Sequence, residues 1–432
     1  MRFPTSAARV GSDAMHPDPD YSAAVVVVET DRDDGIEGHG LAFTLGRGNE
    51  VVVAAIEALA PLVVGLPLEA IRSDMGWVWR RLAGDGQLRW LGPEKGVIHL
   101  ATAAIVNALW DLRARWTAQP LWRHLVDCPP EELVACIDFR HLTDALTPDT
   151  ALALLRGRAA DRSAAVARLD HEGLAAYTTA PGWLGYADHE LASRCRQAAA
   201  EGWGLVKLKV GQSLEDDRRR CAIAREAIGP QRRLAVDANQ VWDVDTAIAW
   251  TRQLMAFDLR WVEEPTSCDD VLGHATIARA VAPVTVATGE HVHNRVMFKQ
   301  FLAAGAMGVC QLDACRLGGV NEVLAVLCLA ALHDVPVCPH AGGVGLCEMV
   351  VHLAAFDALA VGGERADRTV EWVEGLHEHF QDPVAASGGR YALPTAPGFG
   401  TALRPESVRR YRYPDGEAWR QRTGAVAPAS PG

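Results

Sequence analysis

Three acidic side chains close three successive apolar runs in the middle of the sequence. Asp237 ends Leu-Ala-Val-Asp, Glu263 ends Leu-Arg-Trp-Val-Glu, and Glu290 follows Val-Ala-Thr-Gly, with spacings of 26 and 27 residues. Each spacing fits one strand plus one helix, so the carboxylates are predicted to meet at the carboxyl ends of parallel strands. Converging carboxylates repel one another and favour a divalent cation, and all-oxygen ligands select Mg²⁺. A helix cap or a solvated loop would explain one such acid, but not three in register.

A second glutamate, Glu264, directly follows Glu263 and is the competing ligand. Neighbouring residues on a strand face opposite sides of the sheet, so only one of the two can point into a barrel. The regular spacing to Asp237 and Glu290 favours Glu263, and Glu264 is expected to point outward.

Two lysines lie one strand earlier, in Val206-Lys207-Leu208-Lys209-Val210. Residues i and i+2 of a strand project to the same side, so both ammonium groups are predicted to enter the site of the carboxylates. Burial, the neighbouring ammonium group and a bound cation would each lower a lysine pKa, which suits a general base. A solvated edge strand is the alternative, and the apolar residues around the pair argue against it.

A carboxylate and an imidazole continue the same register. Asp313 ends one apolar run, and His340 ends the next run 27 residues later. On adjacent strand ends, the aspartate would orient the imidazole ring and stabilise its charged form. His333 and His352 are predicted to be structural, whereas His340 precedes Ala341–Gly343, a backbone suited to close approach of a ligand.

Strand-like runs and helical stretches alternate from about residue 170, and this alternation would position the site. It indicates parallel βαβ units, and repeats of 23 to 30 residues favour a closed barrel. An open doubly wound sheet is the alternative, but no G-x-G-x-x-G follows the first strand. The joining helices include Val244–Met255 and Val320–Leu332. The predicted strands are Leu205–Val210, Arg233–Asp237, Leu259–Glu263, Val284–Thr288, Gly308–Asp313 and Val335–His340.

The first hundred or so residues follow a different pattern. Tyr21–Asp31 predicts a strand, glycines and aspartates as far as Gly40 predict a turn, and Leu41–Thr44 is the expected hairpin partner. Val51–Val64 and Leu91–Trp116 have helical periodicity. Strands followed by helices indicate an α+β domain. We place this domain at residues 1–150, the barrel at 151–390, and a C-terminal segment with a flexible tail, returning to the first domain, at 391–432.

Composition and charge exclude several classes of partner. The 432 residues include 54 acidic and 42 basic side chains, a formal net charge of −12. This acidity argues against nucleic acid or an anionic membrane as partner, and we expect neither a signal peptide nor a transmembrane segment. The ten cysteines contain no C-x-x-C pair, which predicts reduced core thiols in a cytoplasmic protein.

Together, the K-x-K pair, the three carboxylates and the Asp313–His340 pair resemble the enolase superfamily, in its mandelate racemase subgroup. The resemblance covers nearly the whole chain and implies an α/β fold, a (β/α)7β barrel behind an N-terminal capping domain. Members carry an extra N-terminal strand segment before the stretch that begins here at Arg2. We therefore expect either a longer native start or a capping sheet without that edge piece.

Local strings resemble L-fuconate dehydratases more closely, at residues 11–21, 90–96, 177–179 and 181–186. This resemblance implies Glu371 as a further active-site acid, and Asp13, Trp90, Tyr177 and Asn239 as substrate-binding residues. Trp90 offers a ring for the methyl group of a 6-deoxy acid, and Asp13 offers a hydroxyl acceptor. Packing in the capping core is the alternative for Trp90.

The implied reaction is Mg²⁺-dependent dehydration of an acid sugar, with L-fuconate as substrate and 2-keto-3-deoxy-L-fuconate as product. Lys209 would remove the C2 proton, while His340, oriented by Asp313, would protonate the departing 3-hydroxyl. Lys207 would stabilise the substrate carboxylate, and Glu371 would hydrogen-bond it. A racemase or epimerase, or a dehydratase of another acid sugar, could use the same residues, whereas a non-catalytic relative should have lost some of them. We also expect a homo-oligomer.

Overall fold

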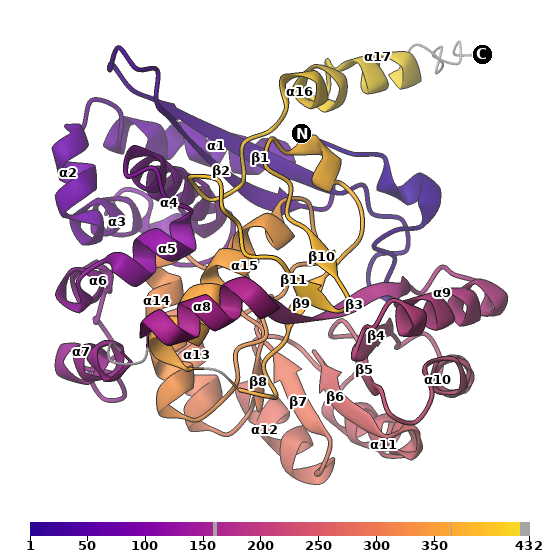
Figure 1. Cartoon of the computed structure of the whole chain (residues 1–432). Coiled ribbons are helices and arrows are strands. Elements are labelled where there is room, and N and C mark those ends of the chain that lie inside the picture. The colour runs from indigo at the N-terminus through magenta and orange to yellow at the C-terminus, as the bar shows by residue number, and fades with distance from the viewer. Residues whose placement is uncertain (159–161, 364, 424–432) are drawn as a thin grey trace.

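The computed structural model describes residues 1–158, 162–363 and 365–423, which form a capping part and a barrel packed against each other (Figure 1). In the capping part, strands β1 (Ser22–Glu29) and β2 (Glu37–Thr44) form an antiparallel hairpin, and helix α4 (Gly96–Trp116) packs across it. The other helices of this part are α1 (Asn49–Leu59), α2 (Leu68–Ser73), α3 (Met75–Ala83), α5 (Leu121–Asp127) and α6 (Pro130–Cys136), with short 3-10 turns at Thr5–Ala8, Ala60–Leu62 and Arg89–Leu91.

Strand β2 begins earlier than the sequence pattern indicates. The predicted turn reaches Gly40, but β2 already starts at Glu37 and includes Gly38 and Gly40. A Cβ atom on either glycine would lie 2.2 Å from a backbone oxygen of α4. The turn prediction is therefore wrong at this point, because these glycines serve the close approach of strand and helix.

The barrel is built from parallel strands in sequence order, as predicted. Strand β9 (Val370–Trp372) pairs in parallel with the first strand of the barrel. After the sixth strand of the barrel, a single bridge from Cys310 to Val337 takes the place of a regular strand. The α/β barrel with an N-terminal capping domain is thus confirmed. The remaining barrel strands are β3 (Leu174–Gly182), β4 (Leu205–Lys209), β5 (Arg233–Asp237), β6 (Leu259–Glu263), β7 (Thr285–Thr288) and β8 (Val309–Cys310).

Helices join the barrel strands and cover their outer side (Figure 1). The joining helices are α9 (Asp188–Ala200), α10 (Leu214–Ile228), α11 (Val244–Leu254), α12 (Val271–Ala280), α13 (Arg295–Ala303), α14 (Val320–Leu332) and α15 (Leu346–Phe356). Helices α7 (Pro148–Gly157) and α8 (Arg162–Glu172) lead into β3. Among the described residues, no helix has both the length and the apolar character needed to cross a bilayer.

The C-terminal segment returns to the start of the chain. The small strands β10 (Ala386–Ser387) and β11 (Arg390–Tyr391) extend the sheet beside β3, and helices α16 (Pro405–Tyr411) and α17 (Glu417–Thr423) follow. The backbone N–H of Arg2 donates to the Tyr411 carbonyl at 3.0 Å, and Trp419 Nε1 donates to the Arg2 carbonyl at 3.0 Å. The tail predicted to be flexible, from residue 424, lies outside the described residues.

Buried side chains from both parts fasten the capping helices to the barrel. Trp79 Nε1 donates to the Gly318 carbonyl at 2.7 Å, Trp110 Nε1 to Asn321 Oδ1 at 2.8 Å, and Asn107 to the Ala314 carbonyl at 3.0 Å. Each of these hydrogen bonds is buried, so the two parts share one continuous interior.

Candidate active site

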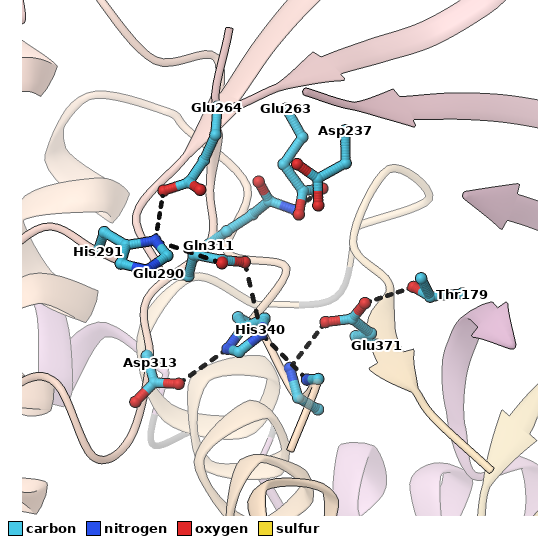
Figure 2. A network of polar contacts seen from close by, with 12 residues as sticks. Thr179, Asp237, Glu263, Glu264, Glu290, His291, Gln311, Asp313, His340 and Glu371 are labelled. Atoms are coloured by element: carbon cyan, nitrogen blue, oxygen red, sulfur yellow. Dashed lines mark hydrogen bonds and ion pairs between the residues drawn. The ribbon is translucent and has the colours of Figure 1, made fainter. Parts of the chain in front are cut away.

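The three predicted metal-ligating carboxylates lie together at the carboxyl ends of the barrel strands (Figure 2). One oxygen each of Asp237, Glu263 and Glu290 lies within 4.8 Å of the others, and all three side chains are buried. Burial raises the pKa of Glu263 well above its usual value, and the neighbouring carboxylates raise it further against the opposing charge of Lys207. Glu290 Oε2 is buried without a hydrogen-bond partner among the described residues. Crowded carboxylate oxygens of this kind fit a hard divalent cation.

Glu264 is not directed outward, in contrast to the alternation argument. It is fully buried, accepts a hydrogen bond from His291 Nδ1 at 2.8 Å, and lies 3.2 Å from Gln240 Nε2. Strand β6 ends at Glu263, and Glu264 has a φ of 42°, so the alternation of faces stops there. Both glutamates thus face the same end of the barrel, but Glu263 is grouped with Asp237 and Glu264 with His291.

The two lysines enter this group of carboxylates directly. Lys209 Nζ lies 2.5 Å from Asp237 Oδ2, while Lys207 Nζ lies 2.5 Å from Glu263 and 3.0 Å from Glu371. Burial lowers the pKa of both lysines, but the carboxylates outweigh it and hold each pKa above its usual value. This differs from the predicted lowering, because each lysine forms an ion pair that strand alternation does not reveal. The Lys209 side chain is 8% exposed against 1% for Lys207, so Lys209 is the more accessible of the two.

His340 approaches the same carboxylates from another side of the barrel (Figure 2). Its Nδ1 lies 2.8 Å from Asp313 Oδ2, and its Nε2 lies 3.4 Å from Glu290 Oε2. Burial lowers the pKa of His340, but Glu290, Asp313 and Glu371 raise it to about 10. An imidazolium at neutral pH is suited to donate a proton.

Glu371 connects the lysine strand with the loop that carries His340. Its Oε2 accepts the backbone N–H of Ala341 at 2.8 Å, and its Oε1 accepts the hydroxyl of Thr179 and lies 3.0 Å from Lys207. The following glycines make room: a Cβ on Gly342 would lie 2.8 Å from His340 Nε2. Glu371 is therefore placed to fix Lys207 and the His340 loop relative to each other.

The four predicted substrate-binding residues occupy different environments. Burial raises the pKa of Asp13, and the positive charge of Lys209 opposes that shift. Asn239 is buried, and its Oδ1 has no hydrogen-bond partner among the described residues. Trp90 is 92% exposed, so it is neither in the capping core nor packed against the carboxylates.

Tyr177 is the most deeply buried of the four. It lies in the barrel interior, its ring packs edge-on against Trp261, and Lys207 Nζ lies 5.6 Å from the ring centroid. The ring is thus placed beside Lys207, and its role in substrate binding stays a prediction.

Sequence reasoning missed several polar residues of the site. Gln311 Nε2 donates to Glu263 at 2.6 Å, and Thr179 and His291 bond to Glu371 and Glu264. Gln311 could have been found from the sequence, because residues two apart in a strand face the same side and Gln311 lies two residues before Asp313. His291 follows Glu290 without any comparable periodic signal.

Two family models match separate stretches of the chain. Residues 15–125 match the mandelate racemase / muconate lactonizing enzyme N-terminal domain. Residues 190–407 match the enolase C-terminal domain-like family. The two matches correspond to the capping part and to most of the barrel.

Known proteins resemble the chain over nearly its full length. Mitochondrial enolase superfamily member 1 from Homo sapiens is 52% identical over 423 residues, covering 98% of this chain and 96% of that protein. L-galactonate dehydratase from Hypocrea jecorina is 48% identical over 426 residues, covering 97% and 94%.

Solved structures show the same arrangement. The crystal structure of human Mitochondrial enolase superfamily member 1 has a TM-score of 0.96 and covers 97% of this chain and 96% of its own. L-talarate/galactarate dehydratase from Salmonella typhimurium LT2, liganded with Mg and L-lyxarohydroxamate, is 25% identical with a TM-score of 0.71, covering 92% and 88%.

Proposed function

This chain belongs to the mandelate racemase / muconate lactonizing enzyme group of the enolase superfamily, and on that basis we propose that it is an Mg²⁺-dependent acid-sugar dehydratase. The observation that carries the proposal is the meeting of the Lys209 amine, the His340 imidazole and three crowded carboxylates in one barrel mouth. A base and an acid on different sides of one group of carboxylates suit removal of a proton and departure of a hydroxyl from adjacent carbons.

The residues divide the proposed chemistry between them. Asp237, Glu263 and Glu290 would hold Mg²⁺, which when bound supplies positive charge beside the substrate carboxylate. Lys209 would take the C2 proton in its neutral form, so its ammonium group would first have to leave the ion pair with Asp237 and release a proton to solvent. Lys207, held by Glu263 and Glu371, would keep a fixed positive charge near the ene-diolate.

His340 is the proposed acid. His340 would give its Nε2 proton to the departing 3-hydroxyl as water leaves. Asp313 holds Nδ1 at 2.8 Å and so fixes the orientation of the ring, and Glu290, Asp313 and Glu371 raise its pKa. The enol that remains becomes a 2-keto-3-deoxy acid.

We propose that the substrate is an aldonate of L-galacto configuration. L-fuconate is the 6-deoxy form of L-galactonate, so the two acids share their stereochemistry at C2 to C5 and differ by one hydroxyl at C6. The 48% identity with L-galactonate dehydratase and the local resemblance to L-fuconate dehydratases both support this configuration. A cytoplasmic location and a homo-oligomeric state remain predictions.

Incubation with acid sugars in D₂O tests this function. With Mg²⁺, L-galactonate and L-fuconate are expected to give 2-keto-3-deoxy products by NMR, and D-gluconate to give little. EDTA should stop the reaction, and added Mg²⁺ should restore it. Deuterium at C2 with inversion and no keto product would instead identify a racemase or epimerase. No turnover of either L-galacto acid would contradict the proposed substrate.

The exposed ring of Trp90 is the proposed selector between the two acids. Trp90→Ala is expected to lower kcat/KM for L-fuconate more than for L-galactonate, about 3- to 10-fold, because an apolar contact with the methyl group is worth about 1 kcal/mol. Trp77, a partly exposed tryptophan on α3, gives the control variant Trp77→Ala, which should leave the ratio unchanged. An unchanged ratio in the Trp90 variant would remove this residue from the specificity site.

A further inference from the structure

Three side chains of types that can bind a metal ion gather on the barrel rim outside the group of carboxylates. One ligand atom each of Cys268, Asp269 and His293 lies within 4.8 Å of the others, with His293 Nε2 3.2 Å from Asp269 Oδ1. Cys268 and Asp269 lie between β6 and α12, and His293 lies between β7 and α13. Two separate loops therefore contribute to the cluster.

The histidine of this cluster has spare binding capacity. His293 Nδ1 is buried and has no hydrogen-bond partner among the described residues. An imidazole that is tied at only one nitrogen by Asp269 can rotate or change tautomer to present a lone pair to a cation. Asp269 itself is largely exposed, so it can adjust its position and still leave room for water.

The ligand types differ from those of the first site. A thiolate, an imidazole and a carboxylate suit Zn²⁺ or Co²⁺, whereas the oxygen trio suits Mg²⁺. Tetrahedral zinc holds sulfur at about 2.3 Å and nitrogen at about 2.0–2.1 Å, so neighbouring ligand atoms lie about 3.3–3.6 Å apart. The cluster needs only small side-chain movements to reach this geometry.

The charges around the thiol are compatible with a cation. Asp269 and Glu264 are negative neighbours of Cys268, and Arg316 is a positive one. Burial raises the pKa of the Cys268 thiol to about 11, so the free thiol carries its proton at neutral pH. Binding would form a sulfur–metal bond, break the S–H bond and release that proton to solvent.

We propose that Cys268, Asp269 and His293 form a second metal site, which takes a zinc-like divalent cation and completes its coordination with water. The site joins the loop after β6 to the loop after β7. It also borders the first site, because Gln240 accepts the backbone N–H of Cys268 at 2.9 Å and contacts Glu264 through its amide nitrogen. A cation there would hold the loop that follows Glu263 to the loop that carries Glu290.

Cobalt titration of the full-length protein in excess Mg²⁺ tests the site. Excess Mg²⁺ competes for the oxygen trio but not for a thiolate, so a thiolate-to-Co²⁺ charge-transfer band would report on Cys268. The band is expected to saturate at one equivalent and to disappear when Zn²⁺ is added. Cys268→Ser should abolish it, and His293→Gln should weaken Co²⁺ binding by about tenfold or more. The buried thiol of Cys195, on α9, gives the control Cys195→Ala, which should keep the band.

Two results would overturn the proposal. One is Co²⁺ binding to the wild-type protein without any thiolate band. The other is a band of unchanged intensity in Cys268→Ser. Circular dichroism and Mg²⁺-dependent turnover of the Cys268 variant establish that the protein is folded, since Cys268 has no place in the proposed reaction. The outcome does not depend on the identity of the sugar substrate.

Discussion

Replacing Lys209 by alanine is expected to remove both dehydration and exchange of the C2 proton with solvent. A positioned general base contributes about 10²- to 10⁴-fold to the rate, so kcat should fall by at least that factor. Lys209 is the more accessible lysine and contacts Asp237 directly, whereas Lys207 is enclosed by Glu263 and Glu371. Turnover and deuterium incorporation at C2 measure the two effects separately. Lys299→Ala, which loses a lysine on α13, should leave both unchanged.

His340→Asn provides the contrasting variant. It removes the proposed acid and leaves the base, so dehydration should fall by a similar factor while exchange at C2 continues. The asparagine amide can still reach Asp313, which limits disturbance of the loop. If the Lys209 variant retained exchange and the His340 variant lost it, the two roles would have to be interchanged.

Of the substitutions named, Glu322→Gln is expected to lower the free energy of unfolding most. This fully buried carboxylate accepts hydrogen bonds from the backbone and guanidinium of Arg295 at 3.0 and 3.1 Å, from Gly318 at 2.8 Å, and pairs with His99 at 2.5 Å. Removing one partner of a buried charge pair costs about 3–5 kcal/mol. The midpoint of denaturant unfolding should therefore fall clearly. The exposed glutamate on α10 gives the control Glu226→Gln, expected to shift stability by less than about 0.5 kcal/mol.

The contribution of Glu322 to the stability of the fold should also decrease as the pH falls. Burial raises the pKa of Glu322, but His99 and Arg295 outweigh it and lower the pKa from 4.5 to about 2. A carboxyl group with a lowered pKa in the folded state stabilises the fold above its unfolded pKa and loses that contribution as pH falls. The stability difference between wild type and Glu322→Gln should therefore shrink between about pH 4.5 and pH 2. A difference that grew in this window would contradict the assignment.

Much of the barrel could be predicted because its periodicity is local. Alternating apolar residues and regular spacings identified β4 to β8, and the same register brought Asp237, Glu263 and Glu290 to one end. The first and last strands, β3 and β9, were not identified from periodicity. Strand β9 has three residues and is defined by its pairing with β3, a contact that is distant in sequence.

The failures arise where strand geometry ends or where contacts are distant. Glu264 left the alternating pattern because the chain turns at positive φ immediately after β6. The local string around Tyr177 did not reveal its depth in the barrel, which follows from packing against Trp261. Gly38 and Gly40 have turn composition, yet the approach of α4 explains them. Local sequence patterns do not reveal these tertiary contacts.

The buried hydrogen bonds from Trp79 and Trp110 to the barrel have a consequence for how substrate enters. A capping part that swung open as a rigid lid would bring both indole rings into water and leave their partners on the Gly318–Asn321 segment unpaired. That cost favours a capping part that stays in place throughout the catalytic cycle. Access then requires loop movements smaller than a rotation of the whole capping part. Loop motions of this size take nanoseconds to microseconds, faster than the hinge motions of whole domains.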